Sequence, residues 1–238
     1  MPYLSIVIPA YNEEKRLLDT LQKVAAFLND QDYEAEVIIV ENGSSDATYA
    51  IAKEFSDQHA QFSAVQEIQS GKGRAVQRGM LEAKGDYRFM CDADLSMPIE
   101  EITNFLPPNS VEDIVIGSRE AKGAVRYDEP SFRHIGGRMV SLLVRLLALP
   151  GLNDTQCGFK IFSSKAAMDV FPRQTIMGWS FDIEVLFIAR RKGYTIKELA
   201  IPWYYREDSH VEPLKDAVLL AMDIFRVRWQ AIFGQYDQ

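Results

Sequence analysis

The chain has few of the residues that build disulfide frameworks and metal-binding modules, since its 238 residues include only two cysteines and three histidines. Cys91 and Cys157 lie far apart and have no metal-ligand spacing, which argues against a zinc module and against a disulfide-stapled secreted domain. Cys91 ends an apolar run, where we expect a small core residue. A reducing, cytoplasmic setting fits both thiols.

Long apolar runs and an excess of positive charge are also absent. No stretch of about 18 uncharged apolar residues occurs, so we expect no transmembrane helix. The first four residues lead into a predicted strand without a basic leader or a signal core. The net charge of −8 argues against a nucleic-acid partner.

The residues that are present have the pattern of an α/β protein. The composition, 47% hydrophobic and 25% charged, is typical of a globular protein with a full core. Strands and helices alternate in the first half, which predicts a mostly parallel, doubly wound, Rossmann-like sheet flanked by helices. We expect strands at 4–8, 36–40, 62–68, 87–91, 113–116, 159–162 and 195–200, and helices at 13–28, 46–55, 73–83, 131–149, 180–191 and 213–233.

An acid pair, Asp92 and Asp94, follows the apolar run 87–91. Residues two apart on a strand share a face, so both carboxylates should emerge together at the carboxyl end of a buried strand, where open α/β sheets bind ligands. Neighbouring carboxylates raise each other's pKa, and a hard divalent cation such as Mg²⁺ relieves that repulsion. The alternative is that Asp94 or Ser96 caps a helix beginning near Pro98.

Two earlier strands also end in polar residues, at 9–14 and at 41–46. Together with the acid pair, these ends predict a crevice of nucleotide size. Tyr11 could stack on a base, Glu41 could accept from a base N–H group, and Asp92 could reach the ribose. Helix capping is the alternative for residues 12–14 and 44–46, but it does not explain Tyr11, Glu41 or the acid pair.

The turn Gly71-Lys72-Gly73 precedes a predicted helix but is not a dinucleotide fingerprint, because Val76 stands where that pattern has its third glycine. Helix-N-terminal N–H groups or Lys72 could face a phosphate here. A solvated lysine is the alternative.

Positive charge is concentrated between Arg119 and Lys165, where eight Lys and Arg residues stand against four Asp and Glu residues. Such a basic region suggests an anionic ligand. Arg138 and Arg145 lie seven residues apart, on one face of the helix predicted over 131–149. The rest of that helix is apolar, and so is one side of the last helix. Each apolar surface is either buried in the protein or laid into a membrane interface.

Five motifs in this order, at residues 7–14, 41–48, 71–76, 92–94 and 117–119, resemble those of inverting glycosyltransferases of family two, which have the GT-A fold. The motifs at 154–160, 179–184 and 201–206 are most similar to those of dolichyl-phosphate or polyprenyl-phosphate hexosyltransferases, especially the β-glucosyl branch. The resemblance extends over essentially the whole chain. It implies one domain, with residues 1–119 as the nucleotide-sugar half and 120–238 as the acceptor half with C-terminal helices.

The resemblance also implies roles for single residues. Donor contacts are implied for Pro9, Tyr11, Glu13, Glu41, Lys72 and Asp92, and the metal (Mg²⁺ or Mn²⁺) is implied on Asp94 with Asp92. Acceptor contacts are implied for Arg119, Arg133, Arg138, Asp154, Gln156, Lys160 and Asp182. Two departures from the family pattern are Glu41-Asn42, where Asp-Asp is usual, and Leu95, which provides no ligand after Asp94.

The function implied is inverting transfer of a hexose, glucose from UDP-glucose, to a dolichyl or polyprenyl phosphate. A phosphate monoester with a second pKa near ~6 is already charged, so it needs no general base but needs arginines to hold it. Asp94 with the cation would stabilise the departing UDP, while Arg119 and Arg133 would align the lipid phosphate. A cytoplasmic protein attached peripherally at the inner membrane face is expected.

Other functions stay open at the level of sequence. The donor could be GDP-mannose. The acceptor could be a carbohydrate or small-molecule hydroxyl, in which case Asp182 or Glu184 would have to act as a base. A nucleotide-binding protein with little catalysis is a third possibility. Trp179 and Trp203 could stack on sugar or lipid, or could serve as core aromatics.

Overall fold

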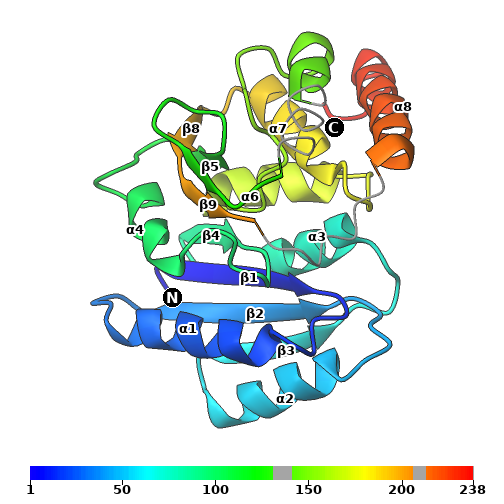
Figure 1. The fold of residues 1–238 in the computed structure, drawn as a ribbon. Helices are drawn as coiled ribbons and strands as arrows, with labels where there is room; N and C mark the ends of the chain where they lie inside the picture. The colour runs from blue at the N-terminus through cyan, green and yellow to red at the C-terminus, as the bar shows by residue number, and fades with distance from the viewer. Residues whose placement is uncertain (131–140, 206–212, 238) are drawn as a thin grey trace.

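A computed structural model describes residues 1–130, 141–205 and 213–237, with the backbone alone for residues 213–218. Its centre is a seven-stranded sheet in the order β3-β2-β1-β4-β7-β5-β8 (Figure 1). The pairs β3–β2, β2–β1, β1–β4 and β5–β8 are parallel, whereas β7 is antiparallel to both of its neighbours. The prediction of a mostly parallel sheet is therefore confirmed, and the antiparallel strand is an addition that the sequence did not show.

The strands of this sheet have short, apolar sequences. They are β1 (Leu4–Ala10), β2 (Ala35–Glu41), β3 (Phe62–Gln66), β4 (Tyr87–Met90), β5 (Ile114–Ser118), β7 (Lys160–Ser163) and β8 (Ile196–Ala200). A second, two-stranded parallel sheet pairs β6 (Val125–Tyr127) with β9 (Pro202–Tyr204). Neither β6 nor β9 is among the strands predicted from the sequence, because three-residue strands carry no readable periodicity.

Helices cover both faces of the large sheet. They are α1 (Leu17–Asn29), α2 (Thr48–Gln58), α3 (Lys72–Glu82), α4 (Ile102–Phe105), α6 (Ser164–Val170), α7 (Phe181–Arg191) and α8 (Pro213–Ile232). Two 3₁₀ turns, η1 (Ile99–Glu101) and η2 (Phe171–Arg173), precede α4 and follow α6, and residues 141–147 are also helical. Helix α6 was not predicted.

The core has two parts, one on each face of the sheet, because alternate strand residues point to opposite sides. Ile6 and Ile8 of β1 pack with α1, α2, η1 and α4, whereas Val7 packs on the side of α3, α6, α7 and α8. The apolar stripe predicted for α1, namely Leu17, Leu21, Val24 and Leu28, is buried as expected. Cys91 and Cys157 are both free and buried.

Two predicted helices begin or extend differently in the structure. The first begins at Leu17 and not at residue 13, because Asn12 has a left-handed φ of 54° and the N–H of Glu13 donates to Thr48 Oγ1 (2.7 Å). These cross-links hold residues 12–14 outside the helix. Of the helix predicted over 131–149, residues 141–147 are helical and residues 131–140 lie outside the described part of the chain.

Among the helices that the structure describes, none has the length and apolar character needed to cross a bilayer.

Candidate active site

The acid pair lies in a turn directly after β4, at the carboxyl edge of the sheet. The backbone turns at Leu95, which has a left-handed φ of 44°, and the N–H of Ser96 donates to Asp94 Oδ1 (2.9 Å). From α1, the buried hydroxyl of Thr20 donates to the Ala93 carbonyl (2.6 Å) and anchors the turn. No side chain caps η1, so Asp94 is available for another role than the capping alternative.

Electrostatics at this turn favour a positive ligand. Burial raises the pKa of Asp94, and the neighbouring Asp92 carboxylate raises it further. Glu13, which is paired with Arg16, also has a raised pKa because of burial, with the Asp94 and Asp92 charges adding to it. Two largely buried carboxyl groups with raised pKa values, Asp94 and Glu13, beside a third acidic side chain are a mark of a functional site.

Lys72 is the first residue of α3, and its ammonium group contacts the acid pair. Nζ lies 2.6 Å from Asp92 Oδ1 and 4.8 Å from the ring centroid of Trp179. Burial alone would lower the pKa of Lys72, but the Asp92 and Asp182 carboxylates outweigh it, so that the pKa is raised. The solvated lysine considered from the sequence is therefore wrong, although contact with a donor phosphate stays a prediction.

A second ion pair, Lys160 with Asp182, lies inside the protein next to the first. Nζ of Lys160 is 2.6 Å from Asp182 Oδ1, and both side chains are buried. Burial raises the pKa of Asp182, against the charges of Lys160 and Lys72. This placement does not favour the predicted direct contacts of Lys160 and Asp182 with an acceptor, and it explains why a lysine follows Phe159 in an otherwise apolar strand.

Gly158 encloses Asp92 on the other side. A Cβ atom on Gly158 would lie 1.8 Å from Asp92 Oδ2, far closer than atoms can approach. The segment that leads into the antiparallel strand β7 thus contains a residue that has to be glycine for Asp92 to keep its position. Gly158 belongs to the motif at 154–160, but its contact with Asp92 could not be predicted from that motif.

The remaining predicted donor residues lie at the ends of β1 and β2. Pro9 is half-buried and Tyr11 is 48% exposed, so its ring is accessible to a base. Glu41 is buried, and its carboxylate accepts from the N–H of Ser44 and from Gln66 Nε2 (3.1 Å). Glu41 therefore already holds the polar loop after β2, and a base contact by it would have to share these bonds.

The hydrogen bonds of Asn42 explain why an asparagine stands where the family pattern usually has the second aspartate. Its Nδ2 donates to the Gln69 carbonyl (2.8 Å), and its Oδ1 accepts from the N–H of Gly71 (2.7 Å). An aspartate could accept but could not donate, so the amide is required to fix the loop that leads to Lys72. This role of Asn42 was not predicted from the sequence.

The predicted acceptor arginine, Arg119, is held by a bidentate ion pair. Its Nε lies 2.7 Å from Asp154 Oδ2, and its Nη2 donates to Asp154 Oδ1 (2.9 Å). Burial opposes the charge on Arg119, but Asp154 outweighs it and raises the pKa of the guanidinium. Asp154 is in turn fixed by Glu198 of β8, whose Oε1 accepts from its N–H (2.8 Å). Asp154 therefore orients Arg119.

Trp203 packs against two guanidinium groups, since Arg119 and Arg126 lie 5.4 Å and 5.9 Å from its ring. Arg126 is itself paired with Glu120 and Glu129. Arg119 and Arg126 of the basic region thus have carboxylate partners, while the excess of positive charge over residues 119–165 remains. Gln156 is half-buried, and Arg133 and Arg138 lie outside the described residues.

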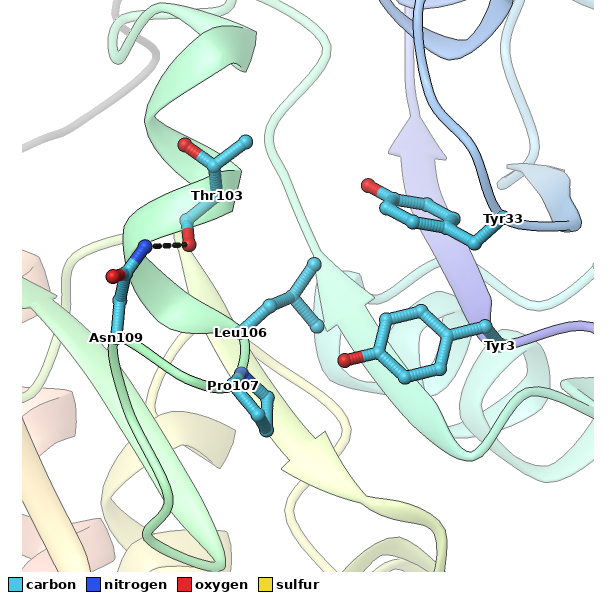
Figure 2. A pocket seen from close by; sticks show the side chains of 6 residues that line it. All are labelled: Tyr3, Tyr33, Thr103, Leu106, Pro107 and Asn109. Atoms are coloured by element: carbon cyan, nitrogen blue, oxygen red, sulfur yellow. Dashed lines mark hydrogen bonds between the residues drawn. The ribbon is translucent and has the colours of Figure 1, made fainter.

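A cavity of about 310 Å³ lies away from this site, near the residue that precedes β1 and the loop after α4. Figure 2 shows Tyr3 and Tyr33 on one side of it and Thr103, Leu106, Pro107 and Asn109 on the other. Burial raises the pKa of Tyr33 to about 12. Since strands of a parallel sheet bind ligands at their carboxyl ends, this cavity is not part of the candidate site.

Comparison with protein families gives a match at residues 5–171 to the family described as Glycosyl transferase family 2. The dolichyl-phosphate beta-glucosyltransferase of Dictyostelium discoideum is 32% identical over 249 residues, covering 98% of this chain and 76% of the relative. The proteins of the same name from Saccharomyces cerevisiae and Homo sapiens are 31% and 30% identical, with 98% of this chain and 76% and 77% of the relatives covered.

Among solved structures, glucosyl-3-phosphoglycerate synthase from Mycobacterium tuberculosis is similar in fold. Its complex with phosphoglyceric acid gives a TM-score of 0.67, and its complex with Mn²⁺ and UDP-glucose gives 0.64. Both alignments cover 95% of this chain and 78% of the other, at 17% sequence identity. At this identity the likeness concerns the fold alone.

Proposed function

Because this chain belongs to glycosyl transferase family 2 and has the GT-A fold, we propose that it transfers glucose from UDP-glucose to the phosphate of a dolichyl or polyprenyl lipid, with inversion at the anomeric carbon. The observation that carries the proposal is the match of 98% of the chain to relatives named dolichyl-phosphate beta-glucosyltransferase. The acid pair, Lys72 and the exposed Tyr11 at one sheet edge are the groups that such a donor requires.

On the donor side, we assign the base to Tyr11 with Pro9 and Glu41, and the ribose to Asp92. Lys72 would contact the diphosphate, since its ammonium group lies beside the acid pair and is held charged there. Glu13, whose carboxylate is paired with Arg16, would fix the loop after β1 around the base.

A divalent cation, Mg²⁺ or Mn²⁺, fits Asp94 and Asp92. The two neighbouring carboxylates repel each other when both are charged, and they provide the hard oxygen ligands that such ions prefer. Within the described residues no group of three or more acidic, histidine or cysteine side chains could hold a metal by itself, so the diphosphate would complete the shell. When bound, the cation would stabilise the negative charge of the leaving UDP.

On the acceptor side, Arg119 would hold the lipid phosphate, with Asp154 keeping its guanidinium in one orientation. One phosphate oxygen attacks the anomeric carbon as the bond from that carbon to UDP breaks, which gives the glucosyl phospholipid and UDP. The phosphate is already ionised and needs no base. That agrees with Glu184, whose buried carboxylate is occupied by four hydrogen-bond donors.

The proposal is tested by incubating the protein with radiolabelled UDP-glucose, Mn²⁺ and a polyprenyl phosphate, and by counting label in the organic phase. Label that depends on both the lipid phosphate and the cation is the expected result. Parallel reactions with GDP-mannose and with a free sugar acceptor test the two alternatives. Transfer to the sugar alone would overturn the lipid-phosphate assignment.

The raised pKa of Asp94 leads to a prediction about pH. The carboxyl of Asp94 should take up a proton at a pH above the ordinary value of about 4 for aspartate, because burial and Asp92 both disfavour its charge. Transfer should therefore decline as pH falls through that raised pKa. Since cation and proton compete for the same oxygens, increasing the Mn²⁺ concentration should move the decline to lower pH. An acid decline that does not respond to Mn²⁺ would contradict the role of Asp94.

We also propose that the protein attaches peripherally to a lipid surface, through an apolar helix pair formed by residues 141–147 and α8. The two helices are adjacent, since Arg228 Nε of α8 donates to the Leu147 carbonyl (2.6 Å; Figure 1). Their exposed apolar side chains, with that of Phe233 directly after α8, are Leu142, Leu143, Leu146, Leu147, Leu219, Met222, Phe225, Trp229 and Ile232. This exposure supports a membrane interface over burial, the two fates considered for these helices.

Arginines lie beside the apolar helix pair. Arg145 donates to Asn153 Oδ1 (3.2 Å), Arg190 to the Pro150 carbonyl (2.6 Å) and Arg228 to the Leu147 carbonyl. These hydrogen bonds go to neutral oxygens, so the guanidinium charges are available to anionic headgroups. Apolar side chains bordered by arginines are typical of reversible, interfacial membrane attachment.

Replacing both Leu146 and Phe225 by glutamate should weaken binding to anionic vesicles at least tenfold, because each lost apolar insertion is worth about 1–2 kcal/mol. The two side chains are 69% and 75% exposed, so the fold should be unaffected. The measurement is flotation with vesicles of phosphatidylcholine and phosphatidylglycerol. Val111→Glu, at a residue that is 78% exposed but precedes β5, is the matched control and should float like the wild type. Equal flotation of the double variant would contradict the proposed surface.

A further inference from the structure

Glu184 is a buried carboxylate for which the proposed reaction has no use. It lies in the first turn of α7, and its side chain is inaccessible to solvent. Oε2 accepts from the N–H groups of Thr175 (2.8 Å) and Ile176 (2.7 Å), and Oε1 accepts from the hydroxyls of Thr175 (2.7 Å) and Tyr236 (2.8 Å). Two backbone donors and two hydroxyls on one carboxylate fix the segment 174–177 in one conformation.

This segment forms the wall against which the Lys72 turn packs. A Cβ atom on Gly71 would lie 2.4 Å from the Met177 carbonyl oxygen, and one on Gly73 would lie 2.8 Å from the Ile176 carbonyl oxygen. Gln174 Nε2 donates to the Gly73 carbonyl (2.9 Å). A side chain at either position that borders Lys72 would therefore collide with the segment held by Glu184, so both positions require glycine.

The contacts form a continuous chain from Glu184 to the acid pair. Glu184 holds residues 175 and 176, the carbonyl groups of Ile176 and Met177 approach the glycines on the two sides of Lys72, and Lys72 pairs with Asp92 (2.6 Å). Trp179, four residues after Thr175, places its ring against the Lys72 ammonium group. A shift of the segment would consequently move both Lys72 and Trp179.

Tyr236 connects this arrangement to the end of α8. Its side chain is buried, and its hydroxyl oxygen lies 2.8 Å from Glu184 and 2.5 Å from Gln230 Oε1. Gln230 is on α8, the helix whose outer side is the exposed apolar surface. Glu184 thus receives one of its donors from the part of the chain that follows that helix.

We propose that Glu184, supported by Tyr236, is a positioning residue for the donor: it fixes the segment 174–177 so that Lys72 is presented to the diphosphate. This inference rests on the proposed function, because it assigns Lys72 to the donor. Glu198 would have the corresponding task for the acceptor, since it accepts from the N–H groups of Asn153 (2.8 Å) and Asp154 (2.8 Å) and so orients Arg119 through Asp154.

The test compares Glu184→Gln with Glu198→Gln in steady-state transfer assays. A glutamine at residue 184 would place its NH₂ group against groups that themselves donate hydrogen bonds, so at least one of the bonds to residue 184 is lost. The loss of one buried hydrogen bond corresponds to a factor of about ten in an equilibrium constant. Glu184→Gln should raise KM for UDP-glucose about tenfold and leave KM for the lipid phosphate within twofold. Glu198→Gln should do the reverse. Tyr236→Phe, which removes one of the donors to Glu184, should raise the donor KM by a smaller factor.

A matched control separates positioning from stability. Glu36 also accepts from a backbone N–H, that of Lys84 (2.6 Å), and from the Ser5 hydroxyl (2.6 Å), but it lies at the opposite edge of the sheet. Glu36→Gln should lower the melting temperature without changing either KM. Equal donor and acceptor KM changes in Glu184→Gln, or none, would overturn the proposal. If Glu184→Gln does not fold, Thr175→Val removes a single hydroxyl from the same carboxylate and should show the same donor-specific effect.

Hydrogen exchange gives a readout that does not depend on transfer. In Glu184→Gln and Tyr236→Phe, exchange should become faster in peptides covering residues 71–77 as well as 174–177, with the rest of the sheet unchanged. A wild type that transfers no glucose would defeat the proposed function, whereas the exchange result would still test the contact from Glu184 to the Lys72 turn. Faster exchange at 174–177 alone would show that the segment does not hold the turn, and would overturn the proposal.

Discussion

Replacing Asp94 by asparagine is expected to reduce glucose transfer on the order of 10³-fold and at the same time to stabilise the metal-free protein at neutral pH. The first effect follows because an amide is a poor cation ligand, the cation's charge stabilisation is worth several kcal/mol, and about 1.4 kcal/mol corresponds to a factor of ten in rate. Asparagine keeps the acceptor for the N–H of Ser96, so the turn after β4 should survive.

The second effect follows from the sign of the pKa shift. Burial and the Asp92 charge raise the pKa of Asp94, so the native state binds this proton more tightly than the unfolded chain does. The free energy of unfolding therefore decreases as pH rises through the raised pKa, and the charged carboxylate costs stability above it. Asp94→Asn removes that cost. The melting temperature, measured at neutral pH without metal, should be higher than that of the wild type.

Asp113→Asn is the matched control for this variant. The N–H of Thr195 donates to Asp113 and is the main reason why its pKa is lowered, so its charge stabilises the fold at pH above the ordinary aspartate pKa. Asp113→Asn should lower the melting temperature and leave transfer unchanged. Retention by Asp94→Asn of more than a tenth of the transfer rate would exclude a cation role for Asp94.

Replacing Gly158 by alanine is expected to have the next largest effect, about a hundredfold loss of kcat/KM, because a misplacement of the reacting groups by about 1 Å costs that much. The new Cβ atom would lie 1.8 Å from Asp92 Oδ2, so the carboxylate has to leave its observed position beside Lys72. UDP binding, measured by calorimetry with Mn²⁺, should weaken as well. The overpacked site should cost about 1–3 kcal/mol of stability, so the variant should still fold.

Gly178→Ala is a suitable control for the glycine substitution. A Cβ atom on Gly178 has no atom within 4 Å, and its φ is not in the left-handed region, so alanine is accommodated there. Gly178→Ala should transfer glucose at the wild-type rate. If Gly158→Ala also stays within threefold of the wild type, Asp92 does not need its observed position, and its assignment to the donor is wrong.

The first strands and helices could be predicted from the sequence because they depend on residues that are close together in the chain. Short, nearly continuous apolar runs in β1 and β2, and the apolar stripe of α1, fix the type and order of these elements. The placement of acids after β4 and of polar loops after β1 and β2 then follows from the rule that parallel strands end at one edge. The family motifs added the nature of the ligand, because they combine these ends in a fixed order.

Contacts between distant segments could not be predicted in this way. Antiparallel pairing of β7 between β4 and β5 brings Gly158 against Asp92, although these residues are far apart in the chain. Lys160 and Arg119 belong to one basic region by sequence, yet the first is buried against Asp182 and the second is held by Asp154. Composition records the charges of such residues but not their partners.

The sequence by itself thus determined the α/β order, the apolar core and the acid pair at a strand end, since these depend on neighbours within a few residues. Only the tertiary structure decided which cations are neutralised, which glycines are required and which carboxylates hold the loops. Asn42 and Glu184 fix the chain on the two sides of Lys72 through bonds to Gly71, Thr175 and Ile176. The reason is physical: a buried polar group must find its partner in space, and the partner's place depends on how the whole sheet is assembled.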